Sequence, residues 1–522
     1  MAKSDAPQVD ISAAMVTDPA TLADWLVIAP LVYCIAVGGF LLMVRKDTNL
    51  QPILAIPGLV LLVILDAALL AHVIMNGPVT MTMGRWLPPF GISFTVDILG
   101  ALLCLTAGIA ALAGGIYGAG DINDSGRRYG FYPFLFLMMG GVSGAFLTGD
   151  VFNLYVWFEV LLIASFGLLV LGSERGQIDG ATKYAFLNLV ATTFFLIATG
   201  YLYGIFGTLN MADIAEKAPE MTDRAPLITL VSLFVLAFAM KAAAFPLNFW
   251  LPASYHTPRV VVSALFAGLL TKVGVYALMR ITLVLFPAER DVLGFAIALV
   301  AAATMIVGAV GALAQTDFRR LLGFLVISGI GIMLAGVALA SQSGVTGTIF
   351  YAVHSMVVMT ALYLACGLAA RVAGGFSIQT SSGVYSSHVL LAAITLVLFF
   401  AVSGLPPFSG FWPKVILVKA SLDVGAWWLA GAILLSGFLT TIAVGRVWLL
   451  AYWRPAGSTT PAGEVGVLDP FIDYLPLVML TGLVVLVGIF PQQVLEISQI
   501  GSDQLINPVD YIRSVFPDGG GQ

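Results

Sequence analysis

Seven ionisable side chains lie deep inside long apolar stretches of this sequence. They are Asp66, His72, Glu159, Lys241, Lys272, His354 and Lys414. A charge at the centre of a bilayer is costly, so a chain that keeps one there generally uses it. Burial favours the neutral forms of lysine and glutamic acid, whereas a neighbouring opposite charge favours their charged forms. A buried Glu–Lys pair can therefore retain or release a proton as the pair closes or opens.

Five of these residues supply the parts of such a device on five separate hydrophobic segments. Glu159 and Lys241 are the candidate switch pair, while Lys272, His354 and Lys414 are the candidate line along which protons move. The three lysines have no matching number of deep acids, so they must be neutral or hydrated. The structural alternatives are that Glu159 or Lys241 is half of an ordinary ion pair and that His354 is a hydrogen-bonding group between helices.

The remaining polar candidates carry weaker arguments. Lys183, near the inner end of its segment, is a candidate point where protons enter, or else a lysine whose amine extends to the interface. Asp66 and His72 are six residues apart and so lie on different helix faces, which favours structural or partner-contact roles. Candidate hydroxyls that would line gaps bridged by water are those of Ser263, Thr271, Ser328 and Ser355.

Membrane helices must position these side chains. The 522 residues are 60% hydrophobic and only 10% charged, with a mean hydropathy of +1.00, whereas soluble domains are about a quarter charged. A membrane span needs about 20 mostly apolar residues, and lipid-facing spans must be helical to satisfy their backbone groups. We therefore predict an all-α polytopic membrane protein with about fourteen transmembrane helices, near residues 26–44, 53–75, 95–117, 131–149, 151–172, 181–206, 226–252, 259–286, 291–314, 321–341, 345–370, 387–420, 427–452 and 471–490.

Two of the predicted helices are interrupted by proline. One contains FAMKAAAFPLNFWLP, which includes Lys241, and the other contains SGLPPFSGFWPK, which ends at Lys414. Proline removes a helix hydrogen bond and clashes with the preceding turn. At membrane depth, freed backbone groups are tolerated only where they are buried in protein or line a cavity. Broken helices in corresponding positions of two halves indicate a transport site.

Two pairs of segments suggest that the halves are repeats. GDVFNLYVWFEV from Gly149 resembles TDFRRLLGFLVI from Thr316, and GLLTKVGVYALMR from Gly268 resembles GFLTTIAVGRVWL from Gly437. The spacing corresponds to about five spans, and an odd number of spans inverts the second copy. The expected organisation is an outward-facing segment 1–25, helices 1–3 in 26–130, inverted repeats in 131–290 and 291–455, and a last helix with a short C-terminal tail in 456–522.

The charge distribution predicts an orientation. Most loop arginines fall on one side under this count, namely Arg45, Arg127, Arg128, Arg175, Arg259, Arg319, Arg320, Arg371 and Arg454. Because positive loops face the cytoplasm, both termini are expected outside a prokaryotic cell membrane. The net charge of −5 is small and dispersed, which argues against nucleic-acid binding.

Several other functional classes lack their motifs. The three cysteines lie in apolar stretches and form neither a disulfide framework nor a CxxC site. No Walker loop, dinucleotide fingerprint, HExxH motif or paired haem histidines are present, so a redox enzyme or an ATP-driven pump is not expected. A passive membrane scaffold is the other class to weigh, although it would not need lysines at helix breaks.

At these motifs the chain resembles the antiporter-like subunits shared by respiratory complex I, membrane-bound hydrogenases and Mrp-type multisubunit cation/proton antiporters. The resemblance covers nearly the whole chain. It rests on FEVLL with Glu159, AMKAAAFPLNFWLP with Lys241, LLTKVGVY with Lys272, YAVHSM with His354 and GLPPFSGFWPK with Lys414. Within the family, the length and the last motif are most similar to the D-type subunits of Mrp antiporters. One complex I antiporter-like subunit carries glutamate where Lys414 stands.

The resemblance implies fourteen helices, two inverted five-helix repeats, partner subunits and no bound cofactor or metal. We expect a proton-translocating subunit of a Na+/H+ antiporter driven by the proton motive force, a secondary transporter rather than an enzyme. The alternative is a redox-driven proton-pumping subunit of complex I or of an energy-converting hydrogenase. The resemblance does not say whether Na+ passes through this chain.

Overall fold

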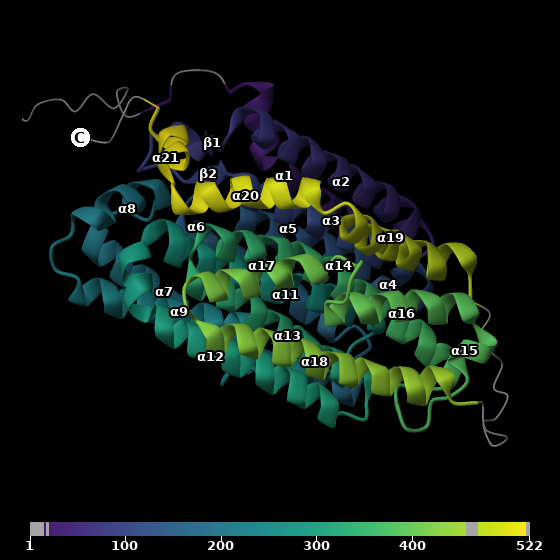
Figure 1. Cartoon of the computed structure of the whole chain (residues 1–522). Helices are drawn as coiled ribbons and strands as arrows, with labels where there is room; N and C mark the ends of the chain where they lie inside the picture. The colour runs from purple at the N-terminus through teal and green to yellow at the C-terminus, as the bar shows by residue number, and fades with distance from the viewer. Residues whose placement is uncertain (1–14, 17–19, 456–467, 518–522) are drawn as a thin grey trace, which may run out of the picture.

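The computed structural model describes residues 15–16, 20–455 and 468–517, and it is an almost entirely helical bundle (Figure 1). Twelve helices in this part of the chain are long and apolar enough to cross a membrane. They are α1 (Leu22–Met43), α2 (Leu50–Asn76), α3 (Ile98–Asp121), α6 (Val151–Leu169), α7 (Arg175–Phe206), α9 (Ala225–Ala242), α11 (Val260–Met279, continued to Leu285), α12 (Pro287–Ala314), α13 (Phe318–Leu339), α14 (Gln342–Ala373), α18 (Trp427–Val447, continued to Trp453) and α19 (Leu475–Ile489, preceded by a turn from Pro470).

Two shorter apolar helices complete the fourteen that the sequence predicts. They are α5 (Phe131–Leu147) and α16 (Val389–Ser403). The fold class is therefore confirmed as all-α and polytopic. The remaining short helices are α4 (Asp124–Tyr129), α8 (Met211–Lys217), α10 (Trp250–Ser254), α15 (Val384–Ser387) and α17 (Phe411–Asp423).

Both predicted breaks are present. Helix α9 ends where Ala243 adopts a left-handed conformation with φ of 60°, and α10 resumes the path after Pro246. Helix α16 ends at Gly404 with φ of 84°, and α17 continues beyond Pro406 and Pro407. A proline cannot donate a backbone hydrogen bond, and glycine accepts a left-handed conformation without steric cost. The sequence therefore dictates both interruptions locally.

The helices follow one another in two equivalent series. The first is α5, α6, α7, the broken α9–α10 and α11, and the second is α12, α13, α14, the broken α16–α17 and α18. In each series the fourth member is the broken one. The two inverted five-helix repeats of residues 131–290 and 291–455 stay a prediction.

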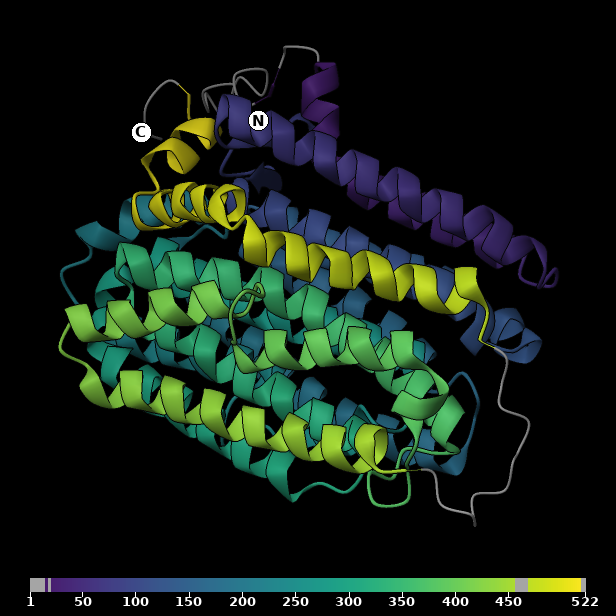
Figure 2. The same ribbon diagram turned by 45° about the vertical axis from the view of Figure 1, so that its right-hand side comes forward.

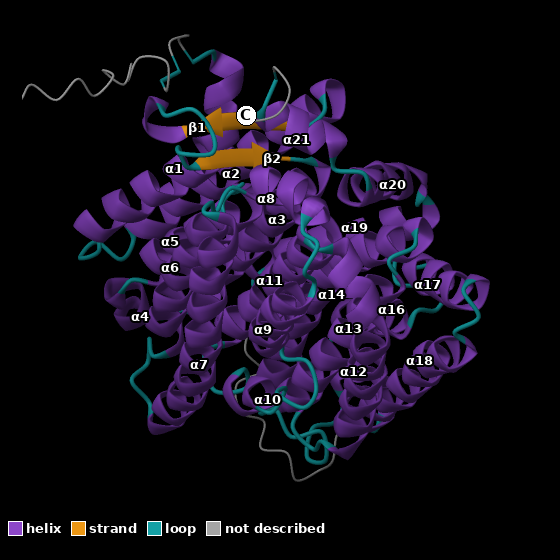
Figure 3. Cartoon of the chain, turned by 90° about the vertical axis from the view of Figure 1, so that its left-hand side faces the viewer, coloured by secondary structure: helices purple, strands orange, loops and turns teal. Residues whose placement is uncertain are grey.

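The centre of the bundle is formed by α11 and α14, which Figure 3 shows surrounded by the other helices. The most apolar window of α11 is entirely buried. A Cβ atom added at Gly268 of α11 would lie 2.2 Å from Thr360 Oγ1 of α14. The absent side chain thus allows these two helices to approach closely. Helix α9 packs against α11, α11 against α14, and α14 against α17.

Two features were not predicted from the sequence. A hairpin of β1 (Val79–Thr82) and β2 (Ser93–Val96) pairs antiparallel, with Val79 opposite Val96. The segment expected to be a short tail contains two further helices, α20 (Gln492–Ile506) and α21 (Val509–Val515). The strands are too short for a clear alternating pattern, and the C-terminal segment is too polar for a membrane span although its apolar residues recur at helical spacing.

The hairpin joins the two ends of the described chain. Val16 N donates to Arg85 O at 2.8 Å, and the Thr80 and Ser514 hydroxyls lie 2.9 Å apart. Most of the predicted segment 1–25 lies outside the described residues. In Figure 2 the last yellow helix, α21, lies at the end of the bundle where the purple α1 begins. The N-terminal and C-terminal segments therefore lie on the same side of the molecule, as an even number of spans requires.

Candidate functional site

Lys241 lies in the last turn of α9, directly before the break. Its side chain is buried, and Nζ donates to Thr192 Oγ1 of α7 at 2.7 Å. The amine also lies over the Phe158 ring of α6, 5.4 Å from the ring centroid, which is within the range of a cation–π contact. The freed backbone at the break is partly satisfied, because Met240 O accepts from Trp250 Nε1 and Phe245 N donates to Thr304 Oγ1.

Glu159 follows Phe158 on α6 and is half-buried. Its Oε1 atom is buried without a hydrogen-bond partner among the described residues. The sequence predicts a close Glu159–Lys241 pair, whereas the Lys241 amine is bonded to Thr192 in this structure. The two candidate switch residues are thus on neighbouring helices, with the amine held by a neutral hydroxyl.

Lys272 lies on α11, the most buried helix of the bundle. It is 1% exposed, and Nζ donates to Ala267 O of the same helix at 2.6 Å. No carboxylate pairs with it within the described part of the chain. Beside it, the buried Thr271 hydroxyl has no hydrogen-bond partner among the described residues.

His354 joins α14 to the second break. Its Nδ1 lies 2.8 Å from Ser409 Oγ, in the segment between α16 and α17, and its Nε2 is buried without a partner in the described structure. A Cβ atom at Gly410 would lie 2.9 Å from His354 Nε2, so glycine leaves the space that the imidazole occupies. The ring thus has one nitrogen held and one free to exchange a proton.

Lys414 lies in the first turn of α17. Its Nζ donates to Val402 O at 3.0 Å and to Ser403 O at 2.8 Å, the last carbonyls of α16. These carbonyls have no partner within their own helix and form the negative end of the helix dipole, so they suit a lysine amine. Lys414 also lines a groove of about 570 Å³ between α17 and α18, which extends to Lys419 and Asp423.

These four basic side chains follow one path through the bundle. The elements that carry Lys241, Lys272, His354 and Lys414 pack against each other in that order. The structure therefore brings the predicted residues onto successive neighbouring elements. It separates Lys183, whose amine forms an exposed ion pair with Asp179 at 2.5 Å near the start of α7.

Two hydrogen-bond partners at the site were not predicted from the sequence. Thr192 belongs to a buried polar stripe on α7 that includes Asn188 and Thr199, and their helical spacing was a usable signal. Ser409 lies inside the proline motif itself. The predicted hydroxyls of Ser263 and Ser328 are bonded to backbone carbonyls, those of Tyr255 and Met305.

A buried ion pair was also missed. Arg280 Nη2 lies 2.5 Å from Asp97 Oδ1, and both side chains are 1% exposed. The guanidinium also lies over the Tyr276 and Tyr511 rings. The pair connects the end of α11 to the start of α3 and the C-terminal helices, away from the line of lysines.

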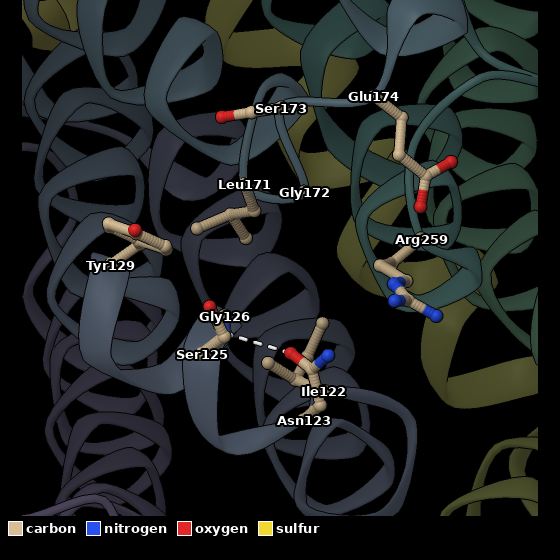
Figure 4. Close-up of a pocket in the computed structure, with 10 residues that line it drawn as sticks. All are labelled: Ile122, Asn123, Ser125, Gly126, Tyr129, Leu171, Gly172, Ser173, Glu174 and Arg259. Atoms are coloured by element: carbon tan, nitrogen blue, oxygen red, sulfur yellow. Dashed lines mark hydrogen bonds between the residues drawn. The ribbon is translucent and has the colours of Figure 1, made fainter.

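Polar pockets occupy the arginine-rich end of the bundle. Figure 4 shows one of about 330 Å³, lined by residues that include Asn123, Glu174 and Arg259. An adjoining pocket of about 600 Å³ shares Glu174 and Arg259 and adds Arg319 and Arg371. Arginines from separate loops that were predicted on one side of the membrane thus meet at one end of the molecule.

His256 lies close to these arginines, outside the membrane-spanning segments. Its Nδ1 lies 2.9 Å from Pro252 O, and its Nε2 lies 3.1 Å from Arg320 Nη2. Burial, followed by the charge of Arg320, lowers the pKa of His256 below its ordinary value. The neutral ring with its proton on Nδ1 satisfies both contacts, because Nε2 then accepts from the guanidinium.

The sequence and the fold of this chain are similar to those of several known proteins. Residues 148–440 match a family described as NADH:quinone oxidoreductase/Mrp antiporter, transmembrane. The D-type subunit of a Na(+)/H(+) antiporter from Alkalihalophilus pseudofirmus is 35% identical over 493 residues, covering 94% of this chain and 99% of the relative. A chain in the structure of an Mrp complex from a Dietzia species matches with a TM-score of 0.87 at 28% identity, covering 95% of this chain and 100% of that one. A chain of respiratory complex I from Thermus thermophilus shares the fold, with a TM-score of 0.78 at 24% identity and coverage of 93% and 100%.

Proposed function

Because the chain belongs to the NADH:quinone oxidoreductase/Mrp antiporter transmembrane family, we propose that it is a proton-translocating subunit of a multisubunit Na+/H+ antiporter driven by the proton motive force. The observation that carries the proposal is the row of buried basic side chains, Lys241, Lys272, His354 and Lys414, on successively packed elements. None of these three buried lysines forms an ion pair with a carboxylate in the described part of the chain, so ordinary ion pairing does not explain why they are there. They fit groups that take up and release protons.

In this proposal Glu159 and Lys241 form the switch. The structure has the Lys241 amine on Thr192, which corresponds to the open arrangement. When the amine moves to the Glu159 carboxylate, the pair stabilises the charged forms of both groups and retains the lysine proton. When it returns to Thr192, the proton is easier to release toward Lys272.

Lys272 and His354 act as the relay in this proposal. Water molecules that bridge two polar groups are nearly as favourable as direct hydrogen bonds, so gaps between the side chains do not prevent proton movement. The partnerless Thr271 hydroxyl and His354 Nε2 are available to such waters.

Lys414 is the proposed terminal exchange site. The groove between α17 and α18 runs from its amine to the exposed Lys419–Asp423 pair, which supports a path to the surface. We place the other end of the proton path at Lys183 on the opposite repeat, because its exposed pair with Asp179 lies near the start of α7.

Assembly and orientation follow from the same family membership. The Mrp relatives are subunits of larger complexes by name, so we propose other antiporter subunits as partners of this chain in a prokaryotic plasma membrane. The polar pockets of the arginine-rich end face the cytoplasm, and both termini face outward. Purification of the native complex tests the partners: small antiporter subunits support the proposal, whereas quinone- or hydrogen-converting subunits would favour a redox-driven pump.

Transport in everted membrane vesicles tests the relay. Lys241→Ala and Lys272→Ala are each expected to reduce Na+-dependent collapse of a pH gradient to background, with the complex still assembled. Lys46→Ala is the matched control, because this lysine is exposed in the turn between α1 and α2 and lies outside the proposed proton path. Full transport by Lys272→Ala, or loss of the complex in that variant, would make Lys272 a packing residue and favour a scaffold.

A further inference from the structure

A buried carboxyl group lies outside the proposed relay. Asp66 of α2 is 0% exposed, and neither of its carboxyl oxygens has a hydrogen-bond partner among the described residues. Helix α2 packs against α1, α3 and α5, none of which carries a relay residue. The opposite face of α2 exposes large apolar side chains, including Leu61 and Ile64.

The surroundings of Asp66 are shaped to hold its side chain. A Cβ atom at Gly108 of α3 would lie 2.6 Å from Asp66 Oδ2, so this glycine leaves the space that the carboxyl group fills. Cys34 of α1 and Cys104 of α3 are buried free thiols within electrostatic reach of it. The buried Ser143 hydroxyl of α5 has no hydrogen-bond partner among the described residues.

The atoms around Asp66 indicate whether its carboxyl group binds a metal cation or a proton. The helices α1, α3 and α5, which pack on α2, contain no lysine or arginine, and the polar side chains that they bring within electrostatic reach of Asp66 are the thiols of Cys34 and Cys104. On α2 itself, His72 is six residues away and bonded to Asn76. Hard cations such as Na+ prefer several oxygen ligands, which this cluster does not supply. The described chain also holds no group of three or more residues suited to a metal ion.

An ionised Asp66 would be a buried, unpaired charge, whose desolvation is far more costly than that of a neutral acid. We propose that Asp66 is a second proton-binding site, off the relay, which holds a neutral carboxylic acid at the α1–α2–α3–α5 junction and reacts with hydrophobic carbodiimides from the lipid. Only α1 and α2 separate it from the apolar surface of the bundle. The proposal involves no relay residue and so stands apart from the proposed function.

The reaction with a carbodiimide reports the protonated form. The acid proton is transferred to one carbodiimide nitrogen, and a carboxyl oxygen forms a bond to the central carbon. The acyl group then migrates from oxygen to nitrogen and gives a stable N-acylurea. No group leaves, so the peptide gains the mass of one reagent molecule.

The experiment uses the assembled complex in native membranes at neutral pH. Dicyclohexylcarbodiimide is expected to add one reagent mass to the peptide that contains Asp66, located by tandem mass spectrometry. A water-soluble carbodiimide is expected to leave that residue unlabelled. Asp66→Asn should remove the modification, and Glu159→Gln should leave it unchanged because Glu159 lies on α6.

Labelling of the wild-type protein in the presence of Na+ shows whether Asp66 binds Na+ or only a proton. Labelling that is equal in Na+ and in choline supports a proton-only site. Protection by Na+ would make Asp66 a cation site and overturn the proposal. Absence of the adduct in the wild-type protein, or equal labelling by the water-soluble reagent, would show an inaccessible or a hydrated ionised group and would overturn it as well.

Discussion

The Lys241 amine is bonded to a neutral hydroxyl in this structure, with an unpaired carboxylate oxygen on a neighbouring helix. Hydrogen bonds between charged groups are about twice as strong as neutral ones, so Thr192 is the weaker of the two acceptors available to Lys241. In the proposed switch the amine alternates between the two acceptors and changes its proton affinity at each move. Thr192 would then be a positioning residue, whose role can be separated from that of Glu159.

Thr192→Val tests this role, because valine keeps the shape and removes the hydroxyl. We expect turnover in vesicles to fall by about tenfold, since a hydrogen bond to a charged group contributes about 1.5 kcal/mol. Thr199→Val is the matched control on the same helix, because its hydroxyl bonds only to Phe195 O. Equal transport by the two variants would show that Thr192 has no role in the proposed Glu159–Lys241 switch.

For individual residues, the sequence predicted burial correctly but did not predict the hydrogen-bond partners. Lys241, Lys272, His354 and Lys414 are all buried as expected, since an apolar flank of about ten residues fixes the depth of a side chain in a span. Their partners depend on helix rotation, which hydropathy does not encode. Thr192 and Ser409 were therefore missed, and Lys183 is exposed beside Asp179.

The broken helix α16–α17 positions Lys414 through its backbone. Gly404 has φ of 84°, and a Cβ atom there would lie 2.5 Å from Lys414 Cδ. Gly404→Ala is therefore expected to destabilise the protein by about 1–2 kcal/mol and to displace the lysine, lowering both the thermal midpoint and transport. Gly431→Ala is the control, because that site on α18 has open space. Unchanged transport in Gly404→Ala would mean that the break does not position Lys414.

Lys414→Glu tests whether the break between α16 and α17 requires a positive charge at position 414. The carbonyls of Val402 and Ser403 accept two hydrogen bonds from the amine, and a carboxylate in their place would meet the negative end of α16. We expect Na+-linked proton movement to fall to background in this variant. Lys46→Glu, at an exposed position between α1 and α2, should retain transport. Activity in Lys414→Glu equal to that of the control would contradict a terminal exchange role.

The sequence predicted the helix breaks more accurately than it predicted the C-terminal helices. Proline indicated both breaks, and Gly404 also indicated the second, because these residues act through local backbone geometry. The helices of the C-terminal segment were missed because α20 is too polar for a span, although its apolar residues recur at the spacing of an amphipathic helix. Its helical form depends on packing against α14 and α3, which is tertiary information.

The whole molecule has one arginine-rich end and one end that carries both described termini. Orientation in the membrane follows from reagent access at engineered cysteines, since the three native cysteines are buried. Ser173→Cys lies in an exposed loop of the arginine-rich end, and Thr222→Cys lies in an exposed loop before α9. An impermeant maleimide should label Thr222→Cys in intact cells and Ser173→Cys only in everted vesicles. The reverse pattern would invert the proposed topology.

The contacts of α20 and α21 also impose an order on biogenesis. Ile98 N, at the start of α3, donates to Gln504 Oε1 at 3.0 Å, across 406 positions of the chain. At ribosomal rates of about 5–20 residues per second, that amide is made roughly 20–80 s before its partner. Tyr511, which covers the Arg280–Asp97 pair, follows later still. The end of the bundle that carries both described termini is thus closed by α20 and α21, so the Arg280–Asp97 pair lacks this cover while the chain from Arg280 to Tyr511 is made.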